Sequence, residues 1–408
     1  MIQRELYLKR LRPFYSSELI KVITGVRRCG KSTLLKQIAR ELADQGVAPD
    51  HILFINFEDY AYKDLANPDR FHAFVEQWFP SEGKSYLLFD EIQNVKDFEL
   101  VVNSFRATRD VSIFLTGSNS KLLSGELSTH LGGRTVSFTM MPFTFKEFCT
   151  FKGQDASQDL LKEYITWGGF PLVCAAPTEE MKVSILSNLY DSIVLKDIIM
   201  RNRIASVHAL ERVVEYLVSS SSLTLSGTSV SKALRDVNQQ VSAPTVYDYI
   251  AYCVQACVIA MVQRYDIRGK KVLAFEEKPY VIDLGLFHLK KNRVKDEFGM
   301  IVETLVHNEL IARGFSVYLG KTNKSEVDFI ASGTASSGPR QKKCYIQTAY
   351  RMDSPETIER EFASLHAIDD NYPKYVVSND DWSLGEQDGI IHIPLLKFLM
   401  DESLVGWK

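Results

Sequence analysis

The chain has 408 residues, which is too long for one ordinary hydrophobic core and is typical of roughly two to four domains. Hydrophobic residues make up 45% of the sequence and charged residues 24%, as in a globular protein in water. The net charge of -3 excludes a uniformly basic surface, so any nucleic-acid binding would depend on local patches.

The cysteines and the apolar stretches favour a cytoplasmic protein. Six cysteines are scattered without a C-x-x-C pair, which favours buried thiols in a reducing compartment over a metal site. The first residues, MIQRELYLKR, lack the apolar core of a signal peptide, and no uncharged apolar run of about 18 residues occurs. We therefore expect a cytoplasmic location and no membrane contact.

One local basic patch occurs at the start of the sequence. The first forty residues contain ten Lys or Arg and two Glu. These cations either flank a polyphosphate site or are solvated surface charges.

The first predicted elements are a strand, a glycine loop and a helix. The segment ELIKVITG (18–25) is apolar, β-branched and ends at a glycine, as buried parallel strands do. The loop GVRRCGKS (25–32) follows, and the apolar residues after Ser32 have helical spacing. Further strands are predicted at 51–57, 85–91 and 111–118, separated by helix-length segments. This alternation predicts an α/β fold with a parallel sheet covered on both faces.

The loop matches the pattern G-x-x-x-x-G-K-[ST] at every fixed position. Gly25 and Gly30 would let backbone N–H groups turn toward phosphates, and the following helix would direct its positive end at them. Lys31 would reach the β- and γ-phosphates, and the Ser32 hydroxyl would bind Mg²⁺. The residues expected to contact ATP are Gly25, Val26, Arg27, Arg28, Cys29, Gly30, Lys31, Ser32 and Thr33.

An acidic pair follows the predicted strand YLLFDEIQ. Asp90 and Glu91 stand at the end of four apolar residues, where unpaired carboxylates would be costly without a cation nearby. We expect Asp90 to hold Mg²⁺ together with Ser32, and Glu91 to orient and polarise the attacking water.

Two further polar positions complete the predicted catalytic set, which is Glu91, Lys31, Asn119 and Arg134. Ser118 or Asn119, after the next strand, would sense the γ-phosphate, although both residue types are also ordinary turn residues. Arg134 follows two glycines and would stabilise transition-state charge in its own subunit or a neighbour's; alternatively it is a surface residue.

Beyond a polar stretch at 151–160, the pattern becomes helical. Two helices are predicted at 229–237 and 242–259, the second with Ser242 as its N-cap, and a β-hairpin at 260–283. This order is that of a winged helix, and the alternative is another small helical domain with a hairpin. A helix at 299–314 and strands at 316–321, 326–332 and 342–350 follow.

The segments GVRRCGKSTLL, INFED, LLFDEIQ, LTGSNS, GGRTVSFTMMPFTFKEF and WGGFP together carry a resemblance that covers essentially the whole chain. The chain resembles prokaryotic AAA-type ATPases with a C-terminal restriction-endonuclease-like domain of unknown function. The resemblance implies a P-loop AAA+ core (1–150), a helical lid (151–205), a winged-helix-like module (206–290) and a restriction-endonuclease-like α/β domain (291–408).

The nuclease-like domain departs from the active pattern of its superfamily. Glu303 and Asp328 match the helix and strand acids, but Gln347 and Ala349 stand where an acid and a lysine are expected. Lys342 and Lys343 lie several residues from the position required of a catalytic lysine. We therefore expect a degenerate fold retained for binding and no nuclease activity.

The sequence thus predicts an Mg²⁺-dependent ATPase in which hydrolysis moves DNA-binding winged-helix and nuclease-like modules. The expected cofactors are ATP and Mg²⁺, and the expected partners are ATP or ADP, DNA and further copies of the chain. The helix from Ser242 and the hairpin Asp266–Lys271 would contact DNA, although that helix is poor in Lys and Arg. The alternative is a nucleotide-gated switch that binds protein and no DNA.

Overall fold

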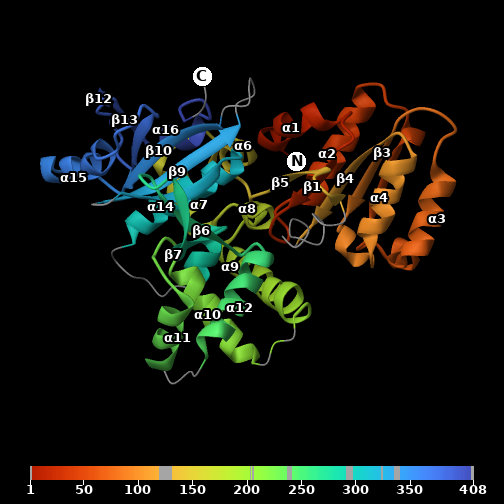
Figure 1. Cartoon of the computed structure of the whole chain (residues 1–408), viewed down its shortest axis with the longest axis horizontal. Helices are drawn as coiled ribbons and strands as arrows, with labels where there is room; N and C mark the ends of the chain where they lie inside the picture. Colours follow the sequence, from red (N-terminus) through yellow and green to blue (C-terminus); the bar gives the residue numbers. More distant parts are fainter. Residues whose placement is uncertain are drawn as a thin grey trace. The chain divides into compact units, whose positions relative to one another are not determined.

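The computed structural model of the chain (Figure 1) describes residues 2–118, 131–202, 204, 206–236, 241–290, 297–322, 325–334 and 341–405. Its contacts divide the chain into two compact units. The first unit is Met1–Met140 with Gln255–Cys257, and the second is Met141–Val254 with Val258–Lys408. The division falls before the predicted boundary at residue 150, because helix α6 (Phe145–Lys152) packs against α7, α8 and α16 of the second unit.

The elements of the first unit alternate between strands and helices. They are α1 (Glu5–Leu11), η1 (Arg12–Phe14), β1 (Ile20–Thr24), α2 (Lys31–Asp44), η2 (Pro49–His51), β2 (Ile52–Asn56), η3 (Tyr60–Ala66), α3 (Pro68–Trp78), β3 (Ser85–Asp90), η4 (Ile92–Asn94), α4 (Phe98–Thr108), β4 (Val111–Gly117) and β5 (Thr135–Thr139). The four predicted strands are therefore confirmed, each within a few residues of its predicted ends.

The five strands of the first unit form one parallel sheet in the order β2-β3-β4-β1-β5. Strand β4 lies between β1, which leads into the glycine loop, and β3, which ends at Asp90. All five strands run in the same direction, so their carboxyl ends meet at one edge of the sheet. This edge carries the loop and the acidic pair.

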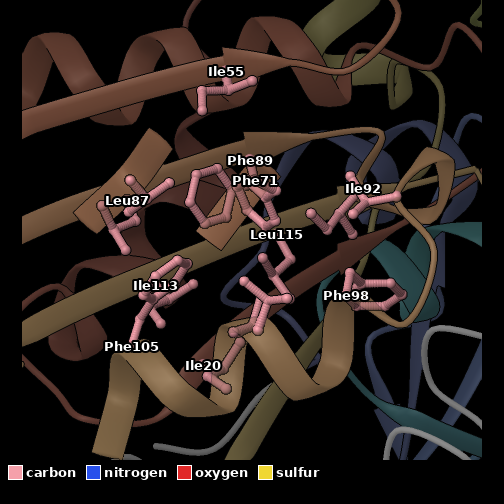
Figure 2. Close-up of a cluster of buried hydrophobic side chains, with 14 of the residues drawn as sticks. Ile20, Ile55, Phe71, Leu87, Phe89, Ile92, Phe98, Phe105, Ile113 and Leu115 are labelled. Carbon is pink, nitrogen blue, oxygen red and sulfur yellow. The ribbon is translucent and has the colours of Figure 1, made fainter. Parts of the chain in front are cut away.

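An apolar cluster between the sheet and helices α3 and α4 holds the first unit together (Figure 2). Phe71 of α3 and Phe105 of α4 pack edge to face, and Phe71 packs in the same way on Phe89 of β3. Because side chains alternate along a strand, the residues between these core positions face the opposite side of the sheet, where α2 contacts β3 and β4. The predicted two-sided cover is thus confirmed.

The second unit is helical at first and mixed afterwards. Its elements are α6 (Phe145–Lys152), α7 (Gln158–Trp167), α8 (Pro171–Ala175), α9 (Glu179–Ser192), the π-helical η6 (Ile193–Ile199), α10 (Val207–Ser219), α11 (Gly227–Asp236), α12 (Ala243–Gln255), β6 (Ile259–Asp266), β7 (Lys271–Val281), α13 (Leu284–Lys290), α14 (Phe298–Ala312), β8 (Ser316–Lys321), β9 (Glu326–Thr334), β10 (Gln341–Ala349), α15 (Pro355–His366), β11 (Lys374–Ser378), β12 (Glu386–Gln387), β13 (Ile390–Pro394) and α16 (Leu395–Met400). Among the described helices, none is long and apolar enough to cross a membrane.

The predicted hairpin is present, and it belongs to a larger sheet than the sequence indicated. Strands β6 and β7 pair antiparallel, and β6 also pairs parallel with β8. The resulting eight-stranded order is β12-β13-β11-β10-β9-β8-β6-β7. The predicted boundary at 290/291 therefore separates strands of one continuous sheet, because β6 lies before that boundary and its partner β8 lies after it.

The glycines of the WGGFP segment allow a close approach to Asp283. A Cβ on Gly168, whose φ is +74°, would lie 1.9 Å from Asp283 Oδ1, and a Cβ on Gly169 would lie 2.2 Å from the Phe143 carbonyl oxygen. The Gly169 N–H donates to Asp283 Oδ2 at 2.7 Å, and the Gly285 N–H donates to Oδ1 at 2.9 Å. Burial raises the pKa of Asp283 to about 7, although these two hydrogen bonds favour the charged carboxylate and lower the pKa. This motif is thus explained by packing within the second unit.

Candidate functional site

The candidate site lies at the carboxyl edge of the first unit's sheet. Strand pairing sets Phe89 opposite Leu115, so Asp90 and Thr116 are neighbours one position further along. Thr24, the last residue of β1, pairs with Gly117 in the same region. The glycine loop, the acidic pair and the end of β4 therefore meet, although they come from three separate stretches of the sequence.

The loop conformation requires its glycines. Gly25 has a φ of +156°, and a Cβ there would lie only 2.2 Å from the Met140 carbonyl oxygen. Gly30 has a φ of +111° and is the N-cap of α2. Arg28 adopts the left-handed region at φ +64° between them, which is uncommon for a residue with a side chain. Together these conformations turn the loop back over the start of the helix.

The nine residues predicted to contact ATP form this loop and the first turn of α2, but not all of their side chains can take part. Val26 and Cys29 are fully buried, and burial raises the pKa of the Cys29 thiol. Only the backbone of these two residues can face a ligand. Arg27 forms an ion pair with Glu58 at 3.2 Å.

Lys31 is buried at the centre of the site. Its ammonium donates to the carbonyl oxygens of Gly25 at 3.0 Å and Val26 at 3.3 Å, and lies 3.6 Å from Glu91 Oε1. A buried ammonium with oxygen partners on two sides is a strong anion-binding group.

Asp90 is fully buried and carries one unsatisfied oxygen. The Thr116 hydroxyl donates to Oδ1 at 2.5 Å, whereas Oδ2 has no hydrogen-bond partner in the described part of the chain. Burial raises the pKa of Asp90, and the hydroxyls of Ser32 and Thr116 oppose that shift. A buried, orphaned carboxylate oxygen beside a serine hydroxyl is suited to a hard divalent cation.

Glu91 is held in a strained backbone conformation. Its φ of +54° and ψ of +46° lie in the left-handed region, and its N–H donates to the Thr116 Oγ1 at 3.0 Å. The Gln93 amide donates to Glu91 Oε2 at 2.5 Å. Backbone strain of this kind persists where the surroundings over-determine it and is common at functional sites.

Sequence reasoning missed Arg4, whose side chain forms a hydrogen bond to the backbone of the loop. The Arg4 side chain is 2% exposed, donates from Nη1 to the Cys29 carbonyl at 2.9 Å, and lies over the Tyr7 ring at 5.0 Å. Gln37 of α2 binds the same segment, accepting the Arg4 N–H at 3.0 Å and donating to the Ile2 carbonyl at 2.7 Å. No local signal in the sequence marks Arg4, because its partner is 25 residues away.

The two remaining residues of the predicted catalytic set are Asn119 and Arg134. Asn119 lies outside the described residues, while Ser118 before it is fully buried. Arg134 immediately precedes β5, and its carbonyl accepts the Ile20 N–H at 2.9 Å. Strands β1 and β5 are parallel, so Arg134 stands at the amino edge of the sheet, opposite the loop. It does not reach the loop of its own subunit, and a role toward a neighbouring subunit stays a prediction.

Several cations of the basic patch are occupied within the first unit. Arg12 pairs with Glu5 at 2.5 Å and with Glu41 at 2.8 Å. Lys21 is fully buried, and its ammonium donates to the Ser112 hydroxyl at 2.8 Å. These residues have partners within the first unit and do not form an open basic surface.

In the second unit, the two acids predicted for the nuclease-like domain interact electrostatically, but a lysine accompanies them. Lys278 of β7 forms ion pairs with Glu303 at 3.0 Å and Glu326 at 3.2 Å. Burial opposes the charge on Lys278, but these carboxylates and Asp328 outweigh it and raise its pKa. Burial and the charge of Glu303 also raise the pKa of Asp328 to about 7. Sequence reasoning missed Lys278 because it lies in the predicted wing.

Gln347 and Ala349 do not supply the acid and the lysine that the active nuclease pattern requires. Gln347 donates to Glu361 of α15 at 3.1 Å, and Ala349 is buried. Gln347 is thus held by a hydrogen bond between β10 and α15, and the absence of nuclease activity stays a prediction.

The sheet order and the glycine loop define an α/β domain of the P-loop AAA+ type. Residues 17–149 match the family model of an AAA domain, and residues 158–296 match that of a domain of unknown function. An uncharacterized protein of Haemophilus influenzae is 36% identical over 405 residues, which are 98% of this chain and 99% of that protein. The uncharacterized protein MJ1544 of Methanocaldococcus jannaschii is 30% identical over 383 residues, which are 89% and 82% of the two chains.

The chain therefore belongs to the family of these two proteins, with an AAA domain in its N-terminal third. Among solved structures, the Walker-type ATPase PABY2304 of Pyrococcus abyssi is similar, with 13% identity and a TM-score of 0.49, covering 71% of this chain and 96% of that one.

Proposed function

We propose that the first unit binds ATP and hydrolyses it with Mg²⁺. The observation that carries this proposal is the meeting of Lys31, the Asp90 carboxylate with its orphaned oxygen, and Glu91 at the carboxyl edge of the sheet. The AAA family model over residues 17–149 supports the same assignment.

Each side chain has a defined part in this proposal. Lys31 exchanges its bonds to the loop carbonyls for oxygens of the β- and γ-phosphates, while N–H groups of the loop and of the first turn of α2 bind the remaining phosphate oxygens. Ser32 and Asp90 hold Mg²⁺, which when bound neutralises charge on the phosphates.

Glu91 orients the attacking water and accepts its proton. Gln93 fixes one Glu91 oxygen, which leaves the other directed toward Lys31.

The test separates binding from hydrolysis. Lys31→Ala should lose ATP binding and turnover, whereas Glu91→Gln should retain binding and lower kcat by about 10²–10⁴-fold. Lys96→Ala and Glu82→Gln, at exposed positions of the same unit, are the matched controls and should behave as wild type. Undiminished turnover in both site variants would refute the assigned roles.

We further propose that hydrolysis is coupled to a nucleic-acid-binding second unit. We divide that unit into a helical lid, a winged-helix-like module formed by α10–α12 and the β6–β7 hairpin, and a degenerate nuclease-like domain. ATP turnover measured with and without single-stranded and duplex DNA tests the coupling. Stimulation supports it, and indifference to both forms of DNA contradicts it.

One observation favours the alternative of a protein-binding switch. Helix α12 contains no Lys or Arg and exposes Tyr247, a composition more suited to a protein contact than to a DNA groove. Partner binding through this face would be insensitive to salt, whereas binding to phosphates weakens steeply as salt rises.

A further inference from the structure

The second unit contains a large cavity that the predicted ATPase and nuclease residues do not use. Its volume is about 1020 Å³, at the upper end of the range of about 300–1,000 Å³ typical of small-molecule pockets. Its walls come from the β6–β7 hairpin, the adjacent strands β8, β9 and β10, and the segment from α15 to β11. We call it the tyrosine cleft. The residues on which the argument depends are Tyr265, Tyr318, Tyr372, Arg268, Lys270 and Lys343.

Aromatic rings from three separate segments of the chain line the tyrosine cleft. Tyr265 of β6 and Tyr318 of β8 lie with their ring centroids 6.1 Å apart, and both are partly exposed. Tyr372, from the segment before β11, is 44% exposed at the rim. Flat rings that are open on one face can stack on planar groups of a ligand.

A partly buried cation lies among these rings. The Lys343 ammonium is 5.4 Å from the centroid of the Tyr265 ring and 5.0 Å from that of Tyr372. The nearby Asp370 carboxylate accepts the Tyr345 hydroxyl on Oδ2 at 2.6 Å and the Tyr372 N–H on Oδ1 at 3.2 Å, and its charge also favours the charged form of Lys343. Burial lowers the pKa of Lys343, so an anionic ligand group would stabilise its charged form.

Two more cations stand at the tip of the hairpin. Arg268 and Lys270 are exposed and line the same cavity. The turn that presents them is shaped by Asp266, whose Oδ1 accepts the N–H groups of Arg268 at 3.1 Å and Gly269 at 2.9 Å. The cleft is therefore lined by three cations, Lys343, Arg268 and Lys270, and by two carboxylates, Asp369 and Asp370, around aromatic and apolar groups. The cations outnumber the carboxylates by one.

We infer that the tyrosine cleft binds single-stranded nucleic acid, with bases stacked on Tyr265, Tyr318 and Tyr372 and backbone phosphates held by Lys343, Arg268 and Lys270. Aromatic platforms next to dispersed cations match a ligand that alternates planar bases with anionic phosphates. A duplex fits this arrangement poorly because its bases are stacked on each other and cannot reach the rings. The inference rests on the proposed function only in naming nucleic acid as the partner, since the cleft lies within the second unit and requires no ATP.

The test is fluorescence anisotropy of the full chain, without nucleotide, titrated against labelled single strands of thymidylate and of uridylate. Tyr372→Ala should weaken binding by about 5- to 150-fold, the effect of losing one stacked base, and Tyr372→Phe should restore it. Trp382→Ala is the matched control, because Trp382 is also 44% exposed in the same unit and does not line the cleft.

Lys270→Ala provides an independent variant at an exposed position. It should reduce the slope of log affinity against log salt by about 0.7, the value for one phosphate contact on a single strand. Binding of either oligonucleotide with these losses supports the inference, and the preferred sugar identifies DNA or RNA.

The inference is overturned if neither strand binds, if a duplex binds equally well, or if Tyr372→Ala and Lys270→Ala both bind as wild type. Lys31→Ala should bind the strands as wild type does, so a failure of the ATPase proposal and a failure of this one are distinguishable.

Discussion

Buried Lys21 should make the free energy of unfolding of the first unit rise with pH. The size of this rise follows from the lowered pKa of Lys21. Lys21 is the second residue of β1, is fully buried, and donates to the Ser112 hydroxyl at 2.8 Å and the Ser17 carbonyl at 3.2 Å. Burial, together with the charge of Lys84, lowers the pKa of Lys21 from 10.5 to about 7. In the folded chain the amine therefore releases its proton more readily than in the unfolded chain.

The sign follows from proton binding. Between pH 7 and pH 10.5 the unfolded chain binds more protons at this residue than the folded chain does, so the free energy of unfolding rises with pH. Below pH 7 both states are protonated, and the full penalty of the buried charge is present. Each pH unit contributes about 1.4 kcal/mol, so the increase from pH 7 to pH 9 is about 2–3 kcal/mol.

Lys21→Met should remove this dependence. We expect the variant to be more stable than wild type at pH 7 and to lose that advantage by about 2–3 kcal/mol at pH 9. Urea unfolding, read by hydrogen–deuterium exchange of peptides covering β1 and β4, reports on this unit, and Lys96→Met at an exposed position is the control. An equal difference between variant and wild type at both pH values would show that the reasoning is wrong.

Three further predictions follow from contacts described above. Arg4→Met leaves the Cys29 carbonyl without its charged donor and should weaken ATP binding, measured by calorimetry, by about 10-fold or more, with the second unit's melting unchanged. Gly169→Ala places a Cβ against the Phe143 carbonyl and should lower the melting temperature of the second unit. Gly299→Ala in α14, where a Cβ meets nothing within 4 Å and φ is not positive, should have a much smaller effect, and equal losses would contradict this account. Wild-type protein should not nick plasmid DNA with Mg²⁺ or Mn²⁺, because Lys278 pairs with the acids of the nuclease-like cluster, and metal-dependent nicking that disappears in Asp328→Asn would overturn this prediction.

Much of the first unit could be predicted from the sequence because its signals are local. The apolar run of β1, the glycines of the loop and the helical spacing after Ser32 lie within one short stretch, where covalent geometry fixes their relation. The position of Asp90 and Glu91 at the end of β3 could be predicted for the same reason, since the end of a buried parallel strand leaves few positions for a carboxylate.

The second unit was harder to predict, because its sheet is assembled across predicted boundaries. The hairpin elements β6 and β7 were found from their alternating pattern, but their pairing with β8 depends on which strand edge is free after folding. The residue pattern of one strand does not specify which other strand it will pair with. The tyrosine cleft has the same origin, since its rings come from separate elements that the sheet brings together.

The sequence by itself determined the loop, the order of strands and helices, and the acidic pair, because each is encoded by residues close together in the chain. Only the tertiary structure decided that Arg4 supports the loop, that Lys21 is buried, that Arg134 stands at the far edge of the sheet and that Lys278 joins the acids of the second unit. These contacts join residues far apart in sequence, and the burial that sets their energies exists only once the strands have paired.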